Sequence, residues 1–165
     1  MIKKAILPVA GLGSRFLPAS KSIPKEMVTV VDRPAIEYVV HEAIKAGIEQ
    51  IILVTHSSKS SIENYFDRNF ELETILEEKK KFDLLAEIRQ IIPAYVSVVS
   101  IRQPQPLGLG HAVLCAKSVV GQDDFAVLLP DVLVKDNSSQ NDLARMISRY
   151  NKNRAAQIMV ESVPD

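Results

Sequence analysis

The chain has 165 residues, 47% of them hydrophobic and 24% charged, and its 20 lysines and arginines balance its 20 aspartates and glutamates. This length predicts a single domain over 1–165 with a sizeable core, and the zero net charge argues against a nucleic-acid partner, which requires a basic face. The lone cysteine, Cys115, excludes an intrachain disulfide, and no apolar run reaches the ~18 residues that a membrane span requires. We therefore expect a soluble, cytoplasmic protein.

Short runs rich in Val, Ile and Leu recur along the chain and predict buried strands. They cover 2–9, 51–55, 96–101 and 125–129, and 155–160 is a candidate fifth strand. Such runs without polar alternation are typical of strands that are buried on both faces of a parallel sheet. Because helical patterns lie between them, the order of elements predicts an α/β fold, with a doubly wound, mainly parallel, Rossmann-like sheet and helices on both faces.

The helix signals between these runs are equally local. Pro34 and Gly47 bracket a helix that reaches about Ala46. Ser60 and Glu63 have the spacing of a capping box, and a long amphipathic stretch follows them up to Pro93. We expect two further helices, from about 110 to 118 and from 141 to 151, and a polar loop over 135–140.

A glycine-rich segment directly follows the first predicted strand. Gly11 and Gly13 let backbone N–H groups approach an anion closely, and Arg15 and Lys25 add cations for phosphate oxygens. Residues 1–35 carry six basic side chains against two acidic ones. The segment therefore predicts a phosphate site, against the simpler alternative of a tight turn with ordinary surface cations.

Two well-known phosphate loops are excluded at this segment. The dinucleotide fingerprint requires a third glycine where this chain has Phe16, which argues against a dehydrogenase. The Walker loop requires Gly-Lys-Ser/Thr, and Lys21-Ser22 follows Ser20 instead.

Two more candidates also follow predicted strands. Gln103, after the third strand, has an amide that suits the imide edge of a pyrimidine, with Gly108 for contact to a flat ring and His111 for a sugar hydroxyl. The alternative is a Pro/Gly-rich connector whose histidine caps a helix.

Asp131, after the fourth strand, suits Mg²⁺, which takes only one or two protein carboxylates. Its alternative is a strand-end turn residue.

The motifs taken together resemble a known family. GLGSR at 11–15, IPKEM at 23–27, THSSK at 55–59, GLGHAVLC at 108–115 and LPDV at 129–132 are similar to the sugar-1-phosphate nucleotidyltransferases. Within that family, they resemble the bacterial UTP–glucose-1-phosphate uridylyltransferases. The similarity covers essentially the whole chain.

The resemblance implies a role for each candidate residue. Arg15 and Lys25 would stabilise the triphosphate and the departing pyrophosphate, Asp131 would hold Mg²⁺, and His111 would lie near the glucose or the ribose. The implied nucleotide-binding residues are Ala10, Gly11, Leu12, Gly13 and Ser14, through their backbone, with Glu26, and Gln103 and Gly108 at the uracil ring.

The resemblance also implies a reaction: a phosphate oxygen of glucose 1-phosphate attacks the α-phosphorus of UTP in line, giving UDP-glucose and pyrophosphate without a covalent intermediate. Family members are considerably longer. We expect a second metal-binding aspartate, a further lysine, most of the sugar-phosphate pocket and the contacts of a homo-oligomer to lie beyond residue 165, so that this chain turns over poorly. A non-catalytic nucleotide-binding module and a thymidylyltransferase acting on glucose 1-phosphate remain open alternatives.

Overall fold

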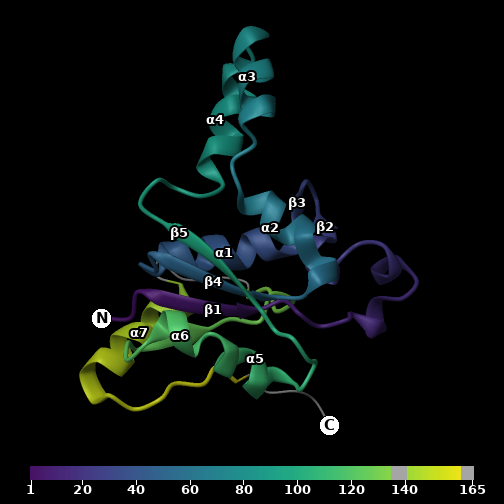
Figure 1. Cartoon of the computed structure of the whole chain (residues 1–165). Coiled ribbons are helices and arrows are strands. Elements are labelled where there is room, and N and C mark those ends of the chain that lie inside the picture. Colours follow the sequence, from purple (N-terminus) through teal and green to yellow (C-terminus); the bar gives the residue numbers. More distant parts are fainter. Residues whose placement is uncertain (135–140, 161–165) are drawn as a thin grey trace.

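A four-stranded parallel sheet forms the centre of the molecule (Figure 1). The computed structural model describes residues 1–134 and 141–160; the predicted loop at 135–140 lies outside them. The strands are β1 (Lys4–Pro8), β4 (Gln50–Thr55), β5 (Ser97–Arg102) and β6 (Phe125–Val127), in the order β5-β4-β1-β6. The four main predicted strands and their parallel arrangement are confirmed, with β6 ending two residues earlier than expected.

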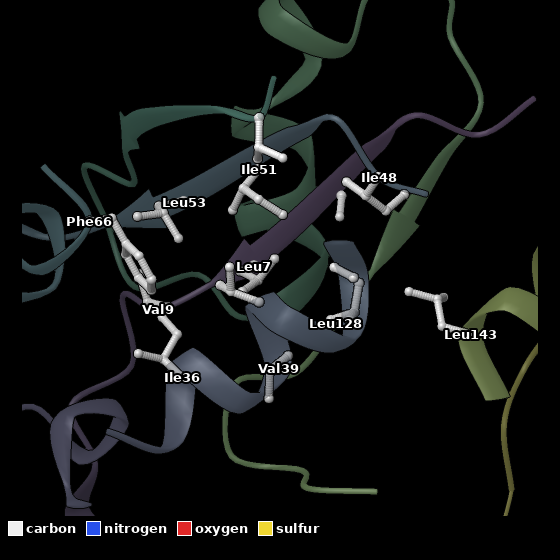
Figure 2. Close-up of a cluster of buried hydrophobic side chains, with 14 of the residues drawn as sticks. Leu7, Val9, Ile36, Val39, Ile48, Ile51, Leu53, Phe66, Leu128 and Leu143 are labelled. Atoms are coloured by element: carbon white, nitrogen blue, oxygen red, sulfur yellow. The ribbon is translucent and has the colours of Figure 1, made fainter. Parts of the chain in front are cut away.

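The sheet explains why its strands lack polar alternation. Successive residues of a strand point to opposite faces. In β1, Leu7 packs into one apolar cluster and Ile6 into another on the opposite face. In β4, Leu53 and Ile52 divide in the same way, and all four side chains are fully buried. Both faces of the sheet are therefore core, and Figure 2 shows the larger of the two clusters.

Helices cover both faces, as predicted. Residues of α1 (Ala35–Lys45), α2 (Ser60–Phe66) and α7 (Asp142–Asn153) belong to the larger cluster. Residues of α5 (Leu109–Cys115) and α6 (Lys117–Val120) belong to the other. Asn141 begins α7 by accepting a hydrogen bond from the Ala144 N–H at 2.7 Å. No helix of the described parts of the chain is long and apolar enough to span a membrane.

The stretch predicted as one long amphipathic run contains separate helices. After α2, α3 (Phe70–Glu78) and α4 (Phe82–Gln90) form a hairpin that projects from the body of the molecule (Figure 1). The chain turns between them at Lys80, which has a positive φ of 54°. Because this turn uses neither glycine nor proline, apolar spacing alone did not reveal it.

Two local predictions were wrong. Glu63 does not close a capping box: Oε1 of Glu63 accepts a hydrogen bond from the Thr55 hydroxyl at 2.6 Å, and Ser60 lies inside α2. Residues 155–160 form no strand, and Ile158 and Val160 are 84% and 85% exposed. An apolar run becomes a strand only where a neighbouring strand satisfies its backbone, and among the described residues none pairs with this one.

Short elements connect β1 to α1. The 3-10 helices η1 (Ser14–Phe16), η2 (Ala19–Lys21) and η3 (Lys25–Met27) come first. The antiparallel pair of β2 (Thr29–Val30) and β3 (Arg33–Pro34) follows. A further 3-10 helix, η4 (Ser57–Lys59), follows β4. Most side chains between β1 and α1 are exposed, in contrast to the sheet.

Candidate nucleotide site at the carboxyl edge of the sheet

The predicted site residues follow the carboxyl ends of three parallel strands. The chain order β1, β4, β5 runs to one side of β1, and β6 pairs on its other side. The strand order therefore reverses between β1 and β6, and ligands of such sheets bind at the carboxyl edge beside this reversal. The glycine turn follows β1 and Asp131 follows β6, so both lie beside it.

The glycine turn presents its backbone to solvent. Ala10 is buried, whereas Gly11 is exposed and Leu12 is 72% exposed. Gly13 has a φ of +67°, and its carbonyl accepts a hydrogen bond from the Ser20 hydroxyl at 2.7 Å. A Cβ atom at Gly13 would stand 3.3 Å from the Cβ atoms of Ser20 and Lys25. Glycine is therefore favoured at position 13 by both its backbone angle and its packing.

Lys25 and Asp131 join the segment after β1 to the segment after β6. The Nζ atom of Lys25 donates to Oδ2 of Asp131 at 2.5 Å. Partial burial by itself raises the pKa of Asp131, but the hydrogen bond and charge of Lys25, with a smaller contribution from Arg15, outweigh it and lower the pKa. Asp131 is thus an ionised carboxylate at neutral pH, in the field of two cations.

Gln103, Gly108 and His111 form a second group. The Nε2 group of Gln103 donates to the Gly108 carbonyl at 3.1 Å and lies 3.0 Å from Nδ1 of His111. Gln103 is 6% exposed, and Gly108 has a φ of +92° where it begins α5. The side chains of Gln103 and His111 are therefore held together after β5, two strands away from the glycine turn along the same edge.

Glu26 differs from the other candidates because it is fully buried. Its Oε2 atom accepts from Nζ of Lys59 at 2.8 Å, and Lys59 is itself only 4% exposed. The Oε1 atom of Glu26 is buried with no hydrogen-bond partner in the described structure. Sequence analysis had assigned no role to Lys59. The THSSK segment was part of the family resemblance, but no local pattern pairs residues 33 positions apart.

The structure thus brings the candidates together in two groups along one edge. Among the described residues no cluster of three or more His, Cys, Asp or Glu side chains is placed to hold a metal. A cavity of about 600 Å³ lies elsewhere, at the base of the α3–α4 hairpin, and contains none of the predicted site residues.

Comparisons with known proteins point to one family. The nucleotidyl transferase family model matches residues 4–165. The UTP–glucose-1-phosphate uridylyltransferase of Haemophilus influenzae is 56% identical over 98% of this chain, and an Escherichia coli K12 protein of the same name is 55% identical over 99%. A solved structure of UDP-glucose pyrophosphorylase from Acinetobacter baumannii is 86% identical over 99% of the chain, with a TM-score of 0.96. A UTP-bound structure of the enzyme from that organism has a TM-score of 0.97.

The chain spans little more than half the length of these relatives. It covers 56% of the Haemophilus protein, 55% of the Escherichia coli protein and 57% of each Acinetobacter chain.

Proposed function

The chain belongs to the nucleotidyl transferase family, and we propose that it forms the nucleotide-binding part of an enzyme that transfers a uridylyl group from UTP to glucose 1-phosphate. The observation that carries this proposal is the Lys25–Asp131 ion pair, which places a cation and a carboxylate beside an exposed glycine turn where the strand order reverses. The names of the similar proteins supply the substrates.

The proposed reaction is one in-line displacement. A phosphate oxygen of glucose 1-phosphate forms a bond to the α-phosphorus of UTP, while the bond from that phosphorus to the bridging oxygen of the β-phosphate breaks. The bridging oxygen keeps the electron pair and leaves as pyrophosphate, and UDP-glucose remains. The attacking phosphate is already ionised, so the site needs no general base and no nucleophile of its own. Catalysis then rests on alignment of two polyanions and on neutralisation of charge.

The residues of the first group suit those tasks. Backbone N–H groups of 10–14 would receive phosphate oxygens at the open turn. Lys25 carries three donors on its amino group, so it can bridge Asp131 and a phosphate oxygen. Arg15 adds a planar fork of donors for the same anion. In the second group, Gln103 and Gly108 would contact the uracil ring and His111 the sugar.

A divalent cation fits the Asp131 carboxylate. Nucleotidyltransferases generally use such a cation, and we propose Mg²⁺. Mg²⁺ keeps several waters and needs only one or two carboxylates when phosphate oxygens complete its shell. The ionised carboxylate of Asp131 beside the phosphate turn would therefore supply one protein ligand to an ion that is shared with UTP. When bound, the ion would neutralise charge on the phosphates.

The wider setting of the enzyme is also part of the proposal. We place it in the cytoplasm and, as the longer protein, in a homo-oligomer without nucleic-acid partners.

Calorimetric titration of the chain with UTP, in the presence and in the absence of Mg²⁺, tests the proposal. We expect UTP to bind, and Mg²⁺ to strengthen binding in the wild-type chain but not in Asp131→Ala. Asp123→Ala is the matched control, because Asp123 precedes β6 at the opposite edge of the sheet and pairs with Lys4. Absence of UTP binding, or an Asp131→Ala variant that keeps the Mg²⁺ effect, would contradict the assignment.

Pyrophosphate release from UTP and glucose 1-phosphate tests the catalytic part. We expect slow or no release by this chain, because it spans about half of its relatives. UTP binding without release by the longer protein would favour the non-catalytic module. A preference for dTTP over UTP would favour a thymidylyltransferase.

A further inference from the structure

The segment that carries the proposed phosphate contacts is mostly exposed. Within residues 11–33, all of which the structure describes, Glu26 is the only buried residue. The segment consists of short 3-10 helices and one small strand pair, and only Met27 adds partial packing against the larger apolar cluster. Apolar burial therefore does little to fix the position of this segment against the sheet.

The partner of Glu26 comes from the segment that follows β4. Lys59 ends η4, which begins two residues after the end of β4, and β4 is paired with a strand on each side. The side chains of Lys59 and Glu26 are 5% and 0% exposed, and the ion pair is 2.8 Å long. A buried ion pair stabilises a structure only where its geometry is good, and removal of one partner leaves an uncompensated charge. The pair therefore joins η3 to η4, the segment between β4 and α2.

The orientation of η3 decides where Lys25 points. Lys25 and Glu26 are successive residues of η3, and a 3-10 helix turns by about 120° per residue. With Glu26 directed inward to Lys59, the side chain of Lys25 is directed to Asp131, at 2.5 Å. The Cβ atom of Lys25 also borders Gly13, so the position of η3 affects the glycine turn as well.

We propose that Lys59 is a positioning residue for the triphosphate site. It acts through its buried ion pair with Glu26, which orients η3 so that Lys25 and the glycine turn face the phosphates. The inference rests on the proposed function, because it assigns Lys59 to the same site. Lys59 itself is buried beneath the segment and needs no contact with the nucleotide.

The test compares UTP with uridine, which carries no phosphate. Both are titrated by NMR into the 165-residue chain and into Lys59→Met. We expect Lys59→Met to weaken UTP binding by about tenfold or more, as loss of a charge-assisted contact does, and to leave uridine binding within about twofold. A parallel loss for both ligands would mean a merely structural role and would overturn the proposal, as would unchanged UTP binding.

Glu73→Gln is the matched control. Glu73 is also a buried carboxylate in an ion pair, with Arg68 and Arg89, but it lies on the α3–α4 hairpin. We expect this variant to lose stability while it keeps the wild-type ratio of UTP to uridine affinity. If Glu73→Gln also lowered the ratio of UTP to uridine affinity, general destabilisation would be sufficient to weaken phosphate binding. That result would also overturn the proposal.

A second variant covers the case in which Lys59→Met does not fold. The double variant Glu26→Gln with Lys59→Met buries no uncompensated charge, so we expect it to fold more readily than Lys59→Met alone. Any direct contact of Glu26 with the nucleoside affects UTP and uridine alike, so the ratio of affinities isolates the phosphate site. We expect a lowered ratio; a wild-type ratio in this folded variant would contradict the role of the pair. Failure of the wild-type chain to bind UTP would instead refute the proposed function.

Discussion

The core around β1 and β4 and the segment 11–33 are held in place by different forces. In the core, Leu7 and Ile52 are fully buried among apolar side chains on the two faces of the sheet. In segment 11–33, the contacts include the ion pairs Lys25–Asp131 and Glu26–Lys59, the ion pairs of Arg33 with Glu37 and Glu87, and a left-handed glycine. Apolar burial stabilises the fold without directional demands, whereas directed polar contacts place charged groups precisely enough to bind a polyanion. Stability and nucleotide binding should therefore respond to different substitutions.

The largest expected effect on stability lies in the core. Leu7→Ala leaves a cavity between the sheet and α1, and we expect the free energy of unfolding to fall by about 2–5 kcal/mol. Urea denaturation measures this loss, and the folded variant should bind UTP normally. Leu12→Ala, at a leucine that is 72% exposed, is the control and should change stability by no more than about 0.5 kcal/mol. Equal losses of unfolding free energy in Leu7→Ala and Leu12→Ala would contradict the division between a stabilising core and an exposed binding segment.

In contrast to Leu7→Ala, Lys25→Met should weaken UTP binding and leave stability nearly unchanged. We expect UTP affinity to fall by about 10- to 100-fold, because a hydrogen bond to a charged group contributes about 1.5–3 kcal/mol. Stability should change little, since the Lys25–Asp131 pair is partly exposed. Calorimetric titration measures the affinity. Lys45→Met is the control, because Lys45 is exposed at the end of α1, which leads toward the amino end of β4. A similar loss of UTP affinity in Lys45→Met would show that the loss of any one positive charge weakens binding, and would contradict a specific contact of Lys25.

Gly13→Ala tests the backbone of the turn, with a smaller expected effect. A φ of +67° costs a non-glycine residue about 1–2 kcal/mol, and the new Cβ would crowd Lys25 and Ser20. Gly11→Ala is the matched control, since a Cβ there meets no heavy atom within 4 Å. The midpoint of thermal unfolding should be lower for Gly13→Ala than for Gly11→Ala. The reverse order would contradict the role given to Gly13.

The ion pairs of the hairpin are expected to have the smallest effect and to depend on pH. Hydrogen bonds from Arg68 and Arg89 lower the pKa of Glu73 to about 2. A carboxyl group with a lowered pKa in the folded state stabilises the fold above its unfolded pKa, and this contribution is lost as pH falls toward 2. Glu73→Gln should therefore be less stable than wild type at neutral pH, and the difference should shrink in acid-unfolding curves between about pH 4.5 and 2. Glu71→Gln, at an exposed neighbour, is the control and should show no such convergence.

Much of this architecture was predictable because its signals are local. Uninterrupted apolar runs indicated strands buried on both faces, and the strands and helices alternate as expected. The strand-end rule then indicated that Gly13 and Asp131, 118 positions apart in the numbering, lie along one edge. Gly11, Gly13, Arg15, Lys25 and Asp131 were identified by their type and by the strand that each follows, whereas Lys59 was not.

Other features depend on contacts between distant parts of the chain. The apolar run at 155–160 has the composition of a strand but no paired neighbour among the described residues. Glu63 has the spacing of a capping residue but bonds to Thr55 of β4 instead. Neither outcome follows from a local pattern, because each depends on which backbone or side chain is nearby in space.

By itself, the sequence determined the class of fold, the edge at which the candidate site lies and the kinds of groups gathered there. It did so because periodicity, glycine and charge act within a few residues. Only the tertiary structure decided that Glu26 is buried and that Lys59 lies beneath it. Burial of a charge is tolerable only against a partner in the right place, and the fold of the sheet supplies that place.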